Sequence, residues 1–106
     1  MKVYVTNQSH HNLDPARKYG ELEYITEGKV NIFRTDDLIA ELKEKLRDFK
    51  KEDFLVFTGN SIVCSLCMSI LLTKYKIIKI LMFNNHSLEY VLRQIDIDRL
   101  DLQEEI

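Results

Sequence analysis

The segment Asp53–Asn84 constrains the fold of this 106-residue chain more than any other. It begins with the apolar run 54–57 and the short polar turn 58–61. An almost uncharged stretch, 62–73, and a second apolar run, 77–83, follow. Continuous apolar runs are typical of strands that are covered on both faces. Because the link between these two strands contains a helix, the sequence predicts a parallel βαβ unit with a right-handed crossover.

Further strands are expected on both sides of this unit. Lys2–Thr6 is a short run rich in β-formers, and Leu88–Ile95 alternates as an edge strand in an antiparallel hairpin with the strand before it. Glu21–Thr26 and Lys29–Phe33 are separated by Glu27-Gly28. They form a hairpin, or the first is a loose edge segment that leads into the second, and the second is the firmer strand prediction.

Two helical segments complete the prediction. Pro15 suits the first position of a short helical turn that ends near Gly20. A longer amphipathic helix is expected to begin at Thr35, which would cap it, and to end near Lys50. Its apolar stripe recurs at steps of three and four residues: Leu38, Ile39, Leu42, Leu46 and Phe49.

The predicted fold class is a compact Rossmann-like three-layer α/β domain. Its sheet is expected to be mostly parallel, with about five strands and an antiparallel edge hairpin. Residues 1–106 form one domain in this prediction, because a chain of this length supports a single core. The acidic segment 96–106 is either a loosely ordered tail or a short segment that docks on a partner.

Composition excludes some partners. A net charge of -2 and a pI near 5.9 argue against binding to duplex nucleic acid. Lys74, Lys76 and Lys79 interrupt the apolar run 61–83, which argues against a membrane span. Two cysteines and an N-terminus that turns polar early favour a reduced, cytoplasmic setting.

Cys64 and Cys67 form a C-x-x-C motif on the predicted buried helix. In redox proteins of the thioredoxin type this spacing lies at a helix start, where the dipole lowers a thiol pKa. Here the first cysteine lies about a turn further in, and the only proline is upstream, at Pro15. Buried small side chains are therefore the favoured interpretation, and redox chemistry is the alternative.

Polar loops follow the predicted parallel strands, and the carboxyl ends of such strands meet at one edge of a sheet. The helix start after Gly59 offers N–H groups to an anion, and glycine permits close backbone approach. The predicted ligand is therefore a phosphate-containing or nucleotide molecule. The predicted ligand-binding residues are Asn7, His10, His11, Thr58, Gly59, Asn60 and Ser61. No cofactor and no metal site are expected, because no carboxylate cluster is visible.

Two alternative functions remain open at this level. Small hydroxyl side chains recur every four residues, at Ser61, Ser65, Ser69 and Thr73. Either this stripe packs in a narrow groove against the domain's own sheet, or Ser65 and Ser69 form the contact of a homodimer that acts as a protein–protein interaction module. The other alternative is an enzyme in which His10 or His11 assists phosphodiester cleavage, because a histidine pKa lies near neutrality.

Several segments resemble a known group of proteins. Tyr4–Asn7, the following His11, Lys18–Leu22 and Thr26–Phe33 are similar to a pattern in small uncharacterised phage and mobile-element proteins with a Rossmann-like fold. The resemblance implies no activity. The βαβ unit with its polar helix start is also similar to Rossmann-like domains that sense cyclic oligonucleotides, which favours nucleotide binding by analogy alone.

Overall fold

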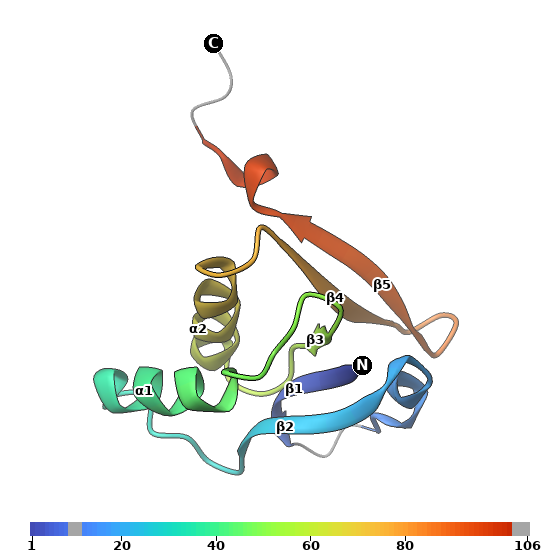
Figure 1. The fold of residues 1–106 in the computed structure, drawn as a ribbon. Coiled ribbons are helices and arrows are strands. Elements are labelled where there is room, and N and C mark those ends of the chain that lie inside the picture. Colours follow the sequence, from blue (N-terminus) through green and yellow to red (C-terminus); the bar gives the residue numbers. More distant parts are fainter. Residues whose placement is uncertain (9–11, 103–106) are drawn as a thin grey trace.

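The computed structural model describes residues 1–8 and 12–102, and Figure 1 shows their arrangement. Five strands, two α-helices and two 3₁₀ helices follow one another along this part of the chain. In order they are β1 (Lys2–Gln8), η1 (Asp14–Tyr19), β2 (Glu21–Glu27), α1 (Thr35–Lys45), β3 (Phe54–Val56), α2 (Ser61–Leu72), β4 (Ile77–Asn84), β5 (Glu89–Asp96) and η2 (Ile97–Leu100).

The strands form a single sheet in the order β2-β1-β3-β4-β5. β1 pairs in parallel with β2 and with β3, β3 pairs in parallel with β4, and β5 is antiparallel to β4. The α/β class, the mostly parallel five-strand sheet, the βαβ unit of 53–84 and the antiparallel edge hairpin are thereby confirmed. The strand order also reverses at β1, because the chain moves to β2 on one side and then to β3 on the other.

For the segment 21–33, the prediction chose the wrong one of its two runs as the firmer strand. Glu21–Glu27 is a regular strand parallel to β1, whereas residues 29–33 form no strand. The Asn31 Oδ1 accepts a hydrogen bond from the Phe33 N–H at 3.0 Å, a local turn that competes with strand pairing. Phe33 is consequently 90% exposed.

The ends of α1 also differ from the prediction. The Thr35 hydroxyl donates to the Ile32 carbonyl at 3.1 Å and does not accept from the helix N–H groups, so it does not cap the helix. The helix ends at Lys45, although Leu46 and Phe49 of the predicted stripe are buried. Burial in the core therefore extends beyond the regular helix.

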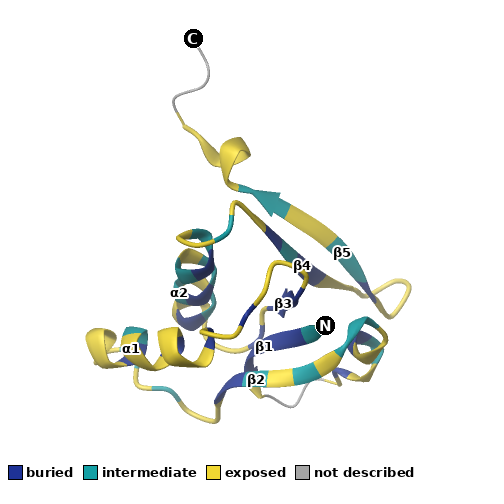
Figure 2. Cartoon of the chain, in the orientation of Figure 1, coloured by how far each residue is buried: buried dark blue, intermediate teal, exposed yellow. Residues whose placement is uncertain are grey.

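The two faces of the sheet are covered differently, as Figures 1 and 2 show. Both α-helices pack on one face, over a core that includes Tyr4, Leu55 and Ile78. The short η1 packs on the other face, over Val3, Val5, Phe54 and their neighbours. The centre of the sheet, at β1 and β3, is buried on both sides.

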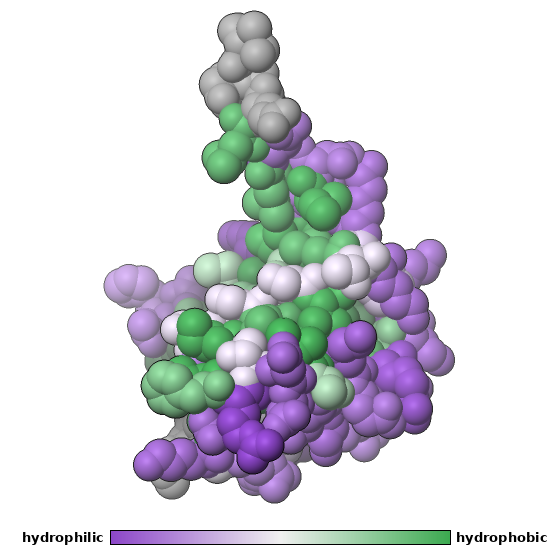
Figure 3. Space-filling model, turned by 90° about the vertical axis from the view of Figure 1, so that its left-hand side faces the viewer, coloured by the Kyte–Doolittle hydropathy of each residue, from purple (hydrophilic) through white to green (hydrophobic). Residues whose placement is uncertain are grey.

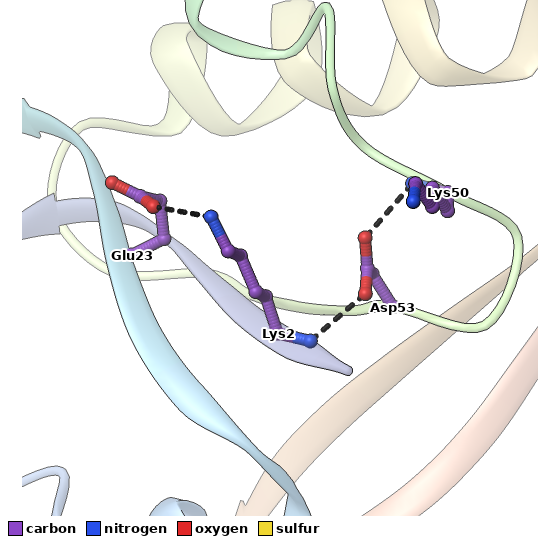
Figure 4. Close-up of polar contacts among 4 residues, drawn as sticks. All are labelled: Lys2, Glu23, Lys50 and Asp53. Carbon is purple, nitrogen blue, oxygen red and sulfur yellow. Dashed lines mark hydrogen bonds and ion pairs between the residues drawn. The ribbon is translucent and has the colours of Figure 1, made fainter.

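At the amino-terminal edge of the sheet, the buried Asp53 joins β1 to the segment that precedes β3 (Figure 4). Its Oδ1 accepts from the Lys2 N–H at 2.8 Å, and its Oδ2 accepts from the Lys50 N–H at 2.8 Å. The Lys2 ammonium lies 3.0 Å from Glu23 of β2, an exposed ion pair. The carboxylate thus has a backbone partner on each oxygen, which fixes how β1 and β3 enter the sheet.

Candidate functional site

Threonine hydroxyls hold the turn after β3 against the end of β1. The Thr6 hydroxyl donates to the Thr58 carbonyl at 2.6 Å and accepts from the Thr58 N–H at 2.7 Å. The Thr58 hydroxyl in turn donates to the Asn7 carbonyl and lies 3.1 Å from the Asn7 N–H. From β2, the Thr26 hydroxyl donates to the Thr6 carbonyl at 2.6 Å. This buried network fixes the backbone where the strand order reverses.

Asn7 lies inside this arrangement and is only 8% exposed. Its Nδ2 donates to the Gly28 carbonyl at 2.9 Å, which orients the amide. Its Oδ1 is buried and has no hydrogen-bond partner among the described residues. Gly59 lies directly against it: with φ of +82°, a Cβ on Gly59 would be 2.8 Å from the Asn7 Cβ. The site therefore contains a buried acceptor without a donor, next to a glycine that permits close approach.

A hollow of about 730 Å³ opens beside this glycine, along the first turns of α2. We call it the α2 hollow, and its lining residues are Phe57, Thr58, Gly59, Ser61, Cys64, Ser65, Met68 and Ser69. None of these residues is charged. Figure 3 shows the side of the molecule where α1 and α2 lie, with hydrophobic surface interrupted by paler, weakly polar patches. Three of the predicted ligand-binding residues line this hollow, namely Thr58, Gly59 and Ser61, and so do Ser65 and Ser69, which were predicted for a dimer.

The start of α2 carries the polar groups that the sequence predicted. The Asn60 side chain accepts a hydrogen bond from the Ile62 N–H at 2.7 Å, so Asn60 is the N-cap. The other N–H groups of a first helical turn have no acceptor within the helix, and they form the positive end of its dipole. Because Ser61 lines the α2 hollow, this turn borders the hollow directly.

A second hollow, of about 570 Å³, lies between the end of β3 and the outer half of β4. We call it the β4 hollow, and its lining residues are Asn12, Val56, Phe57, Thr58, Ile80, Leu81, Met82, Phe83, Asn85 and Tyr90. It exists because β3 ends at Val56, and Thr58 is bonded to β1, whereas β4 continues to Asn84. Phe57 and Thr58 line both hollows.

The structure brings most of the predicted ligand-binding residues together. Asn7, Thr58, Gly59 and Ser61 are neighbours at the carboxyl edge, and Asn60 caps the adjoining helix. His10 and His11, the predicted catalytic candidates, lie outside the described residues. The third histidine, His86, lies at the β4–β5 turn and lines a separate hollow of about 350 Å³.

The sequence analysis missed the apolar side of the β4 hollow. Phe83 and Tyr90 come from the two strands of the hairpin, and their rings lie 5.2 Å apart in an edge-to-face arrangement. The only sequence signal near this hollow was the polar Asn84-Asn85 pair, which directly follows the predicted strand 77–83. The hydrophobic pattern around Phe83 does not distinguish a strand residue in the core from one that borders a hollow.

The two cysteines of the C-x-x-C motif lie in different surroundings: Cys67 is buried in the core, whereas Cys64 is half-buried and lines the α2 hollow. Cys67 is fully buried, and this burial, followed by the nearby Cys64, raises the Cys67 thiol pKa from 9.0 to about 12. The Cys64 sulfur lies 3.4 Å from the Thr6 hydroxyl and 3.5 Å from the Thr58 carbonyl, and both cysteines are free. Redox chemistry requires a thiolate, so Cys67 fits the packing interpretation.

Two further searches bear on the function. Within residues 1–8 and 12–102, no group of three or more His, Cys, Asp or Glu side chains is arranged to hold a metal ion. Over the same part of the chain, no helix has both the length and the apolar character needed to cross a membrane.

The fold and its carboxyl edge define a small α/β domain with an uncharged hollow at the start of α2. The chain belongs to the Phage Pam3 gp32-like protein family, whose model matches residues 1–97. The similarity to phage proteins that the sequence indicated is thereby confirmed. Comparisons with curated proteins and with solved structures give no match.

Proposed function

We propose that this protein binds a small phosphate-containing or nucleotide ligand at the carboxyl edge of its sheet. In this proposal the domain has a Rossmann-like three-layer fold. The two α-helices form the layer on one face of the sheet, and η1 forms the layer on the other. The observation that carries it is the position of the α2 hollow, which borders the first turn of α2 where the strand order reverses. Ligands of open parallel sheets bind at such a reversal.

The chemistry of the hollow favours a ligand with two kinds of groups. The first turn of α2 can donate N–H groups to a phosphate, and its dipole favours negative charge by about 0.3–1 kcal/mol. Asn7 does not line the hollow, but its buried Oδ1 lies next to Gly59 and has no donor among the described residues. A sugar hydroxyl or an amino group is the kind of group that would pair it. A nucleotide carries such donors on its sugar and base in addition to its phosphate, so it offers the site both kinds of groups.

Ligand binding can be tested by calorimetry and thermal unfolding with nucleoside monophosphates, dinucleotides and cyclic oligonucleotides. We expect at least one of them to raise the melting temperature. Ser61→Asp should abolish this rise, because a carboxylate repels an anion while it suits the helix dipole and keeps α2 stable. Ser61→Asn, which changes the size similarly without a charge, is the matched control and should retain binding. No stabilisation by any of these compounds would refute the proposal.

Self-association through the outer face of α2 is the second candidate. Ser61, Ser65 and Ser69 are exposed, Ile62 is 45% exposed, and no residue of 61–72 is charged. A helix face of this kind, with small residues four apart, lets the same face of a second copy approach closely. In this candidate the α2 hollow receives side chains of the other copy.

Light scattering distinguishes the two candidates. A homodimer that uses this face should become monomeric when Ser65 is replaced by arginine, because a buried guanidinium would have no partner. Ala40→Arg, which places the same change on the exposed face of α1, is the control and should leave the dimer intact. A monomer at every concentration up to about 100 µM would exclude this candidate.

A further inference from the structure

We propose that the β4 hollow binds the base of the nucleotide whose phosphate lies at the start of α2. This inference rests on the proposed function and specifies its ligand: a nucleoside phosphate and not a sugar phosphate or a free anion. The observation behind it is that the two hollows share Phe57 and Thr58 as lining residues. The two hollows therefore adjoin at these residues, and in this proposal one ligand occupies both.

Two aromatic side chains give the β4 hollow an affinity for a planar ring. Phe57 and Phe83 both line it, and they are 45% and 43% exposed, so much of their ring surface is accessible. Phe83 is held in place by its edge-to-face contact with Tyr90, which is only 6% exposed. Bases stack on aromatic side chains irrespective of their identity, since every base has a π face.

Polar groups at the same hollow can bond the edge of a base. Asn12 and Asn85 are exposed and both line the hollow, Asn12 from the segment before η1 and Asn85 from the turn after β4. The Asn12 Oδ1 already accepts from the Asp14 N–H, which fixes its amide, whereas the Asn85 side chain has no partner among the described residues. An apolar hollow of about 570 Å³ with a few amide groups is typical of a site for a small heteroaromatic molecule.

Charge also favours a base over a second phosphate at this position. No residue that lines the β4 hollow is charged, and its walls are formed mainly by apolar side chains. A neutral ring can leave water for such a surface, whereas an anion would be desolvated without compensation. The α2 hollow also has no charged lining residue, but it is lined by Ser61 of the first helical turn, which does not line the β4 hollow. The phosphate is therefore assigned to the α2 hollow and the base to the β4 hollow.

The test compares ribose 5-phosphate with the four nucleoside 5′-monophosphates by titration calorimetry. At least one monophosphate should bind about tenfold or more tightly than ribose 5-phosphate, as expected for one stacked base. Phe83→Leu, which keeps an apolar side chain but removes the ring, should reduce this advantage to about threefold or less. It should leave the affinity for ribose 5-phosphate unchanged.

A matched control is available in the chain itself. Phe33→Leu makes the same chemical change at a side chain that is 90% exposed and lines neither hollow, so it should leave every affinity unchanged. Asn85→Ala should weaken binding of the preferred monophosphate relative to the other three, because it removes a group that bonds the base edge.

The outcomes separate this inference from the proposed function. If ribose 5-phosphate binds as tightly as the monophosphates, or if Phe83→Leu leaves their advantage intact, the base site is refuted while phosphate binding stands. If neither kind of compound binds, the proposed function and the base site are both refuted. Folding of the Phe83→Leu variant is established by its unchanged affinity for ribose 5-phosphate.

Discussion

Each edge of the sheet buries a polar side chain of similar size, but the two side chains differ in how completely their polar atoms are hydrogen-bonded. At the amino-terminal edge, both oxygens of the Asp53 carboxylate accept backbone N–H groups. At the carboxyl edge, the Asn7 amide donates to Gly28, but its oxygen has no partner among the described residues. A fully paired buried group stabilises the fold, whereas a buried oxygen without a partner costs stability, a cost that a ligand would relieve under our proposal. The two edges thus differ in how completely their buried side chains are paired.

The largest effect should come from removing the paired group. Asp53→Ala would remove two part-buried hydrogen bonds from the backbone N–H groups of Lys2 and Lys50 to a charged carboxylate, and we expect a loss of about 3 kcal/mol in the free energy of unfolding. Asp53→Asn keeps one acceptor oxygen and should cost about half as much. Urea denaturation measures both. Asp48→Ala removes an exposed carboxylate nearby and should change stability by less than about 0.5 kcal/mol.

A smaller loss of stability is expected when a side chain is added at Gly59, at the carboxyl edge of the sheet. Gly59→Ala places a Cβ 2.8 Å from the Asn7 Cβ and imposes a positive φ on alanine, which together should cost about 2 kcal/mol. Gly28→Ala also imposes a positive φ, of +65°, but meets no atom within 4 Å, so it should cost about 1 kcal/mol. The difference between the two variants in urea denaturation isolates the contact with Asn7. Equal losses would show that this contact is not tight.

Removing the half-paired side chain should cost less again. Asn7→Ala loses the hydrogen bond to Gly28 but also removes a buried oxygen that has no partner, so we expect a loss of about 1 kcal/mol or less. It should at the same time weaken nucleotide binding, which calorimetry would detect. A loss as large as that of Asp53→Ala would contradict the difference between the two edges.

The smallest effect concerns the thiol beside the carboxyl edge. Because the Cys67 pKa rises from 9.0 to about 12 on folding, the unfolded chain loses this proton at lower pH than the folded protein. Stability is therefore complete below pH 9 and declines as the pH rises toward 12, by less than about 1 kcal/mol between about pH 8 and 9.5.

Cys67→Ala should remove this part of the pH dependence. Burial also raises the pKa values of Tyr4 and Tyr90, and their contribution to the decline should persist in the variant. Urea midpoints at three pH values measure the difference. Identical slopes in the two proteins would mean that Cys67 ionises as readily in the folded protein as in the unfolded chain.

The sequence predicted the centre of the fold because hydrophobic pattern and chain connectivity determine it. An uncharged stretch between two apolar runs leaves few alternatives to a βαβ unit, and the short turn after Asn84 requires a hairpin. The hydrophobic pattern led to a wrong prediction at 29–33, where apolar and polar residues alternate as they do in a strand. There the Asn31 side chain forms a local turn, and short-range hydrogen bonds of this kind are not visible in a hydrophobic pattern.

The candidate site was predicted in part. Thr58, Gly59 and Ser61 were identified because strand ends and helix starts follow from local sequence. The burial of Asn7 and the existence of the β4 hollow depend on where distant strands stop pairing. β3 ends at Val56 while β4 continues to Asn84, and no local signal specifies that difference in length.

The short pairing between β3 and β4 has a consequence for how the protein opens. Their described register joins Phe54 to Lys79 and Leu55 to Ile80, whereas β4 and β5 are paired along their whole length. Amide hydrogen exchange should therefore divide the sheet into two cooperative units that separate at this seam. Since the β4 hollow lies across the same seam, a bound ligand would link the two units and slow exchange in both.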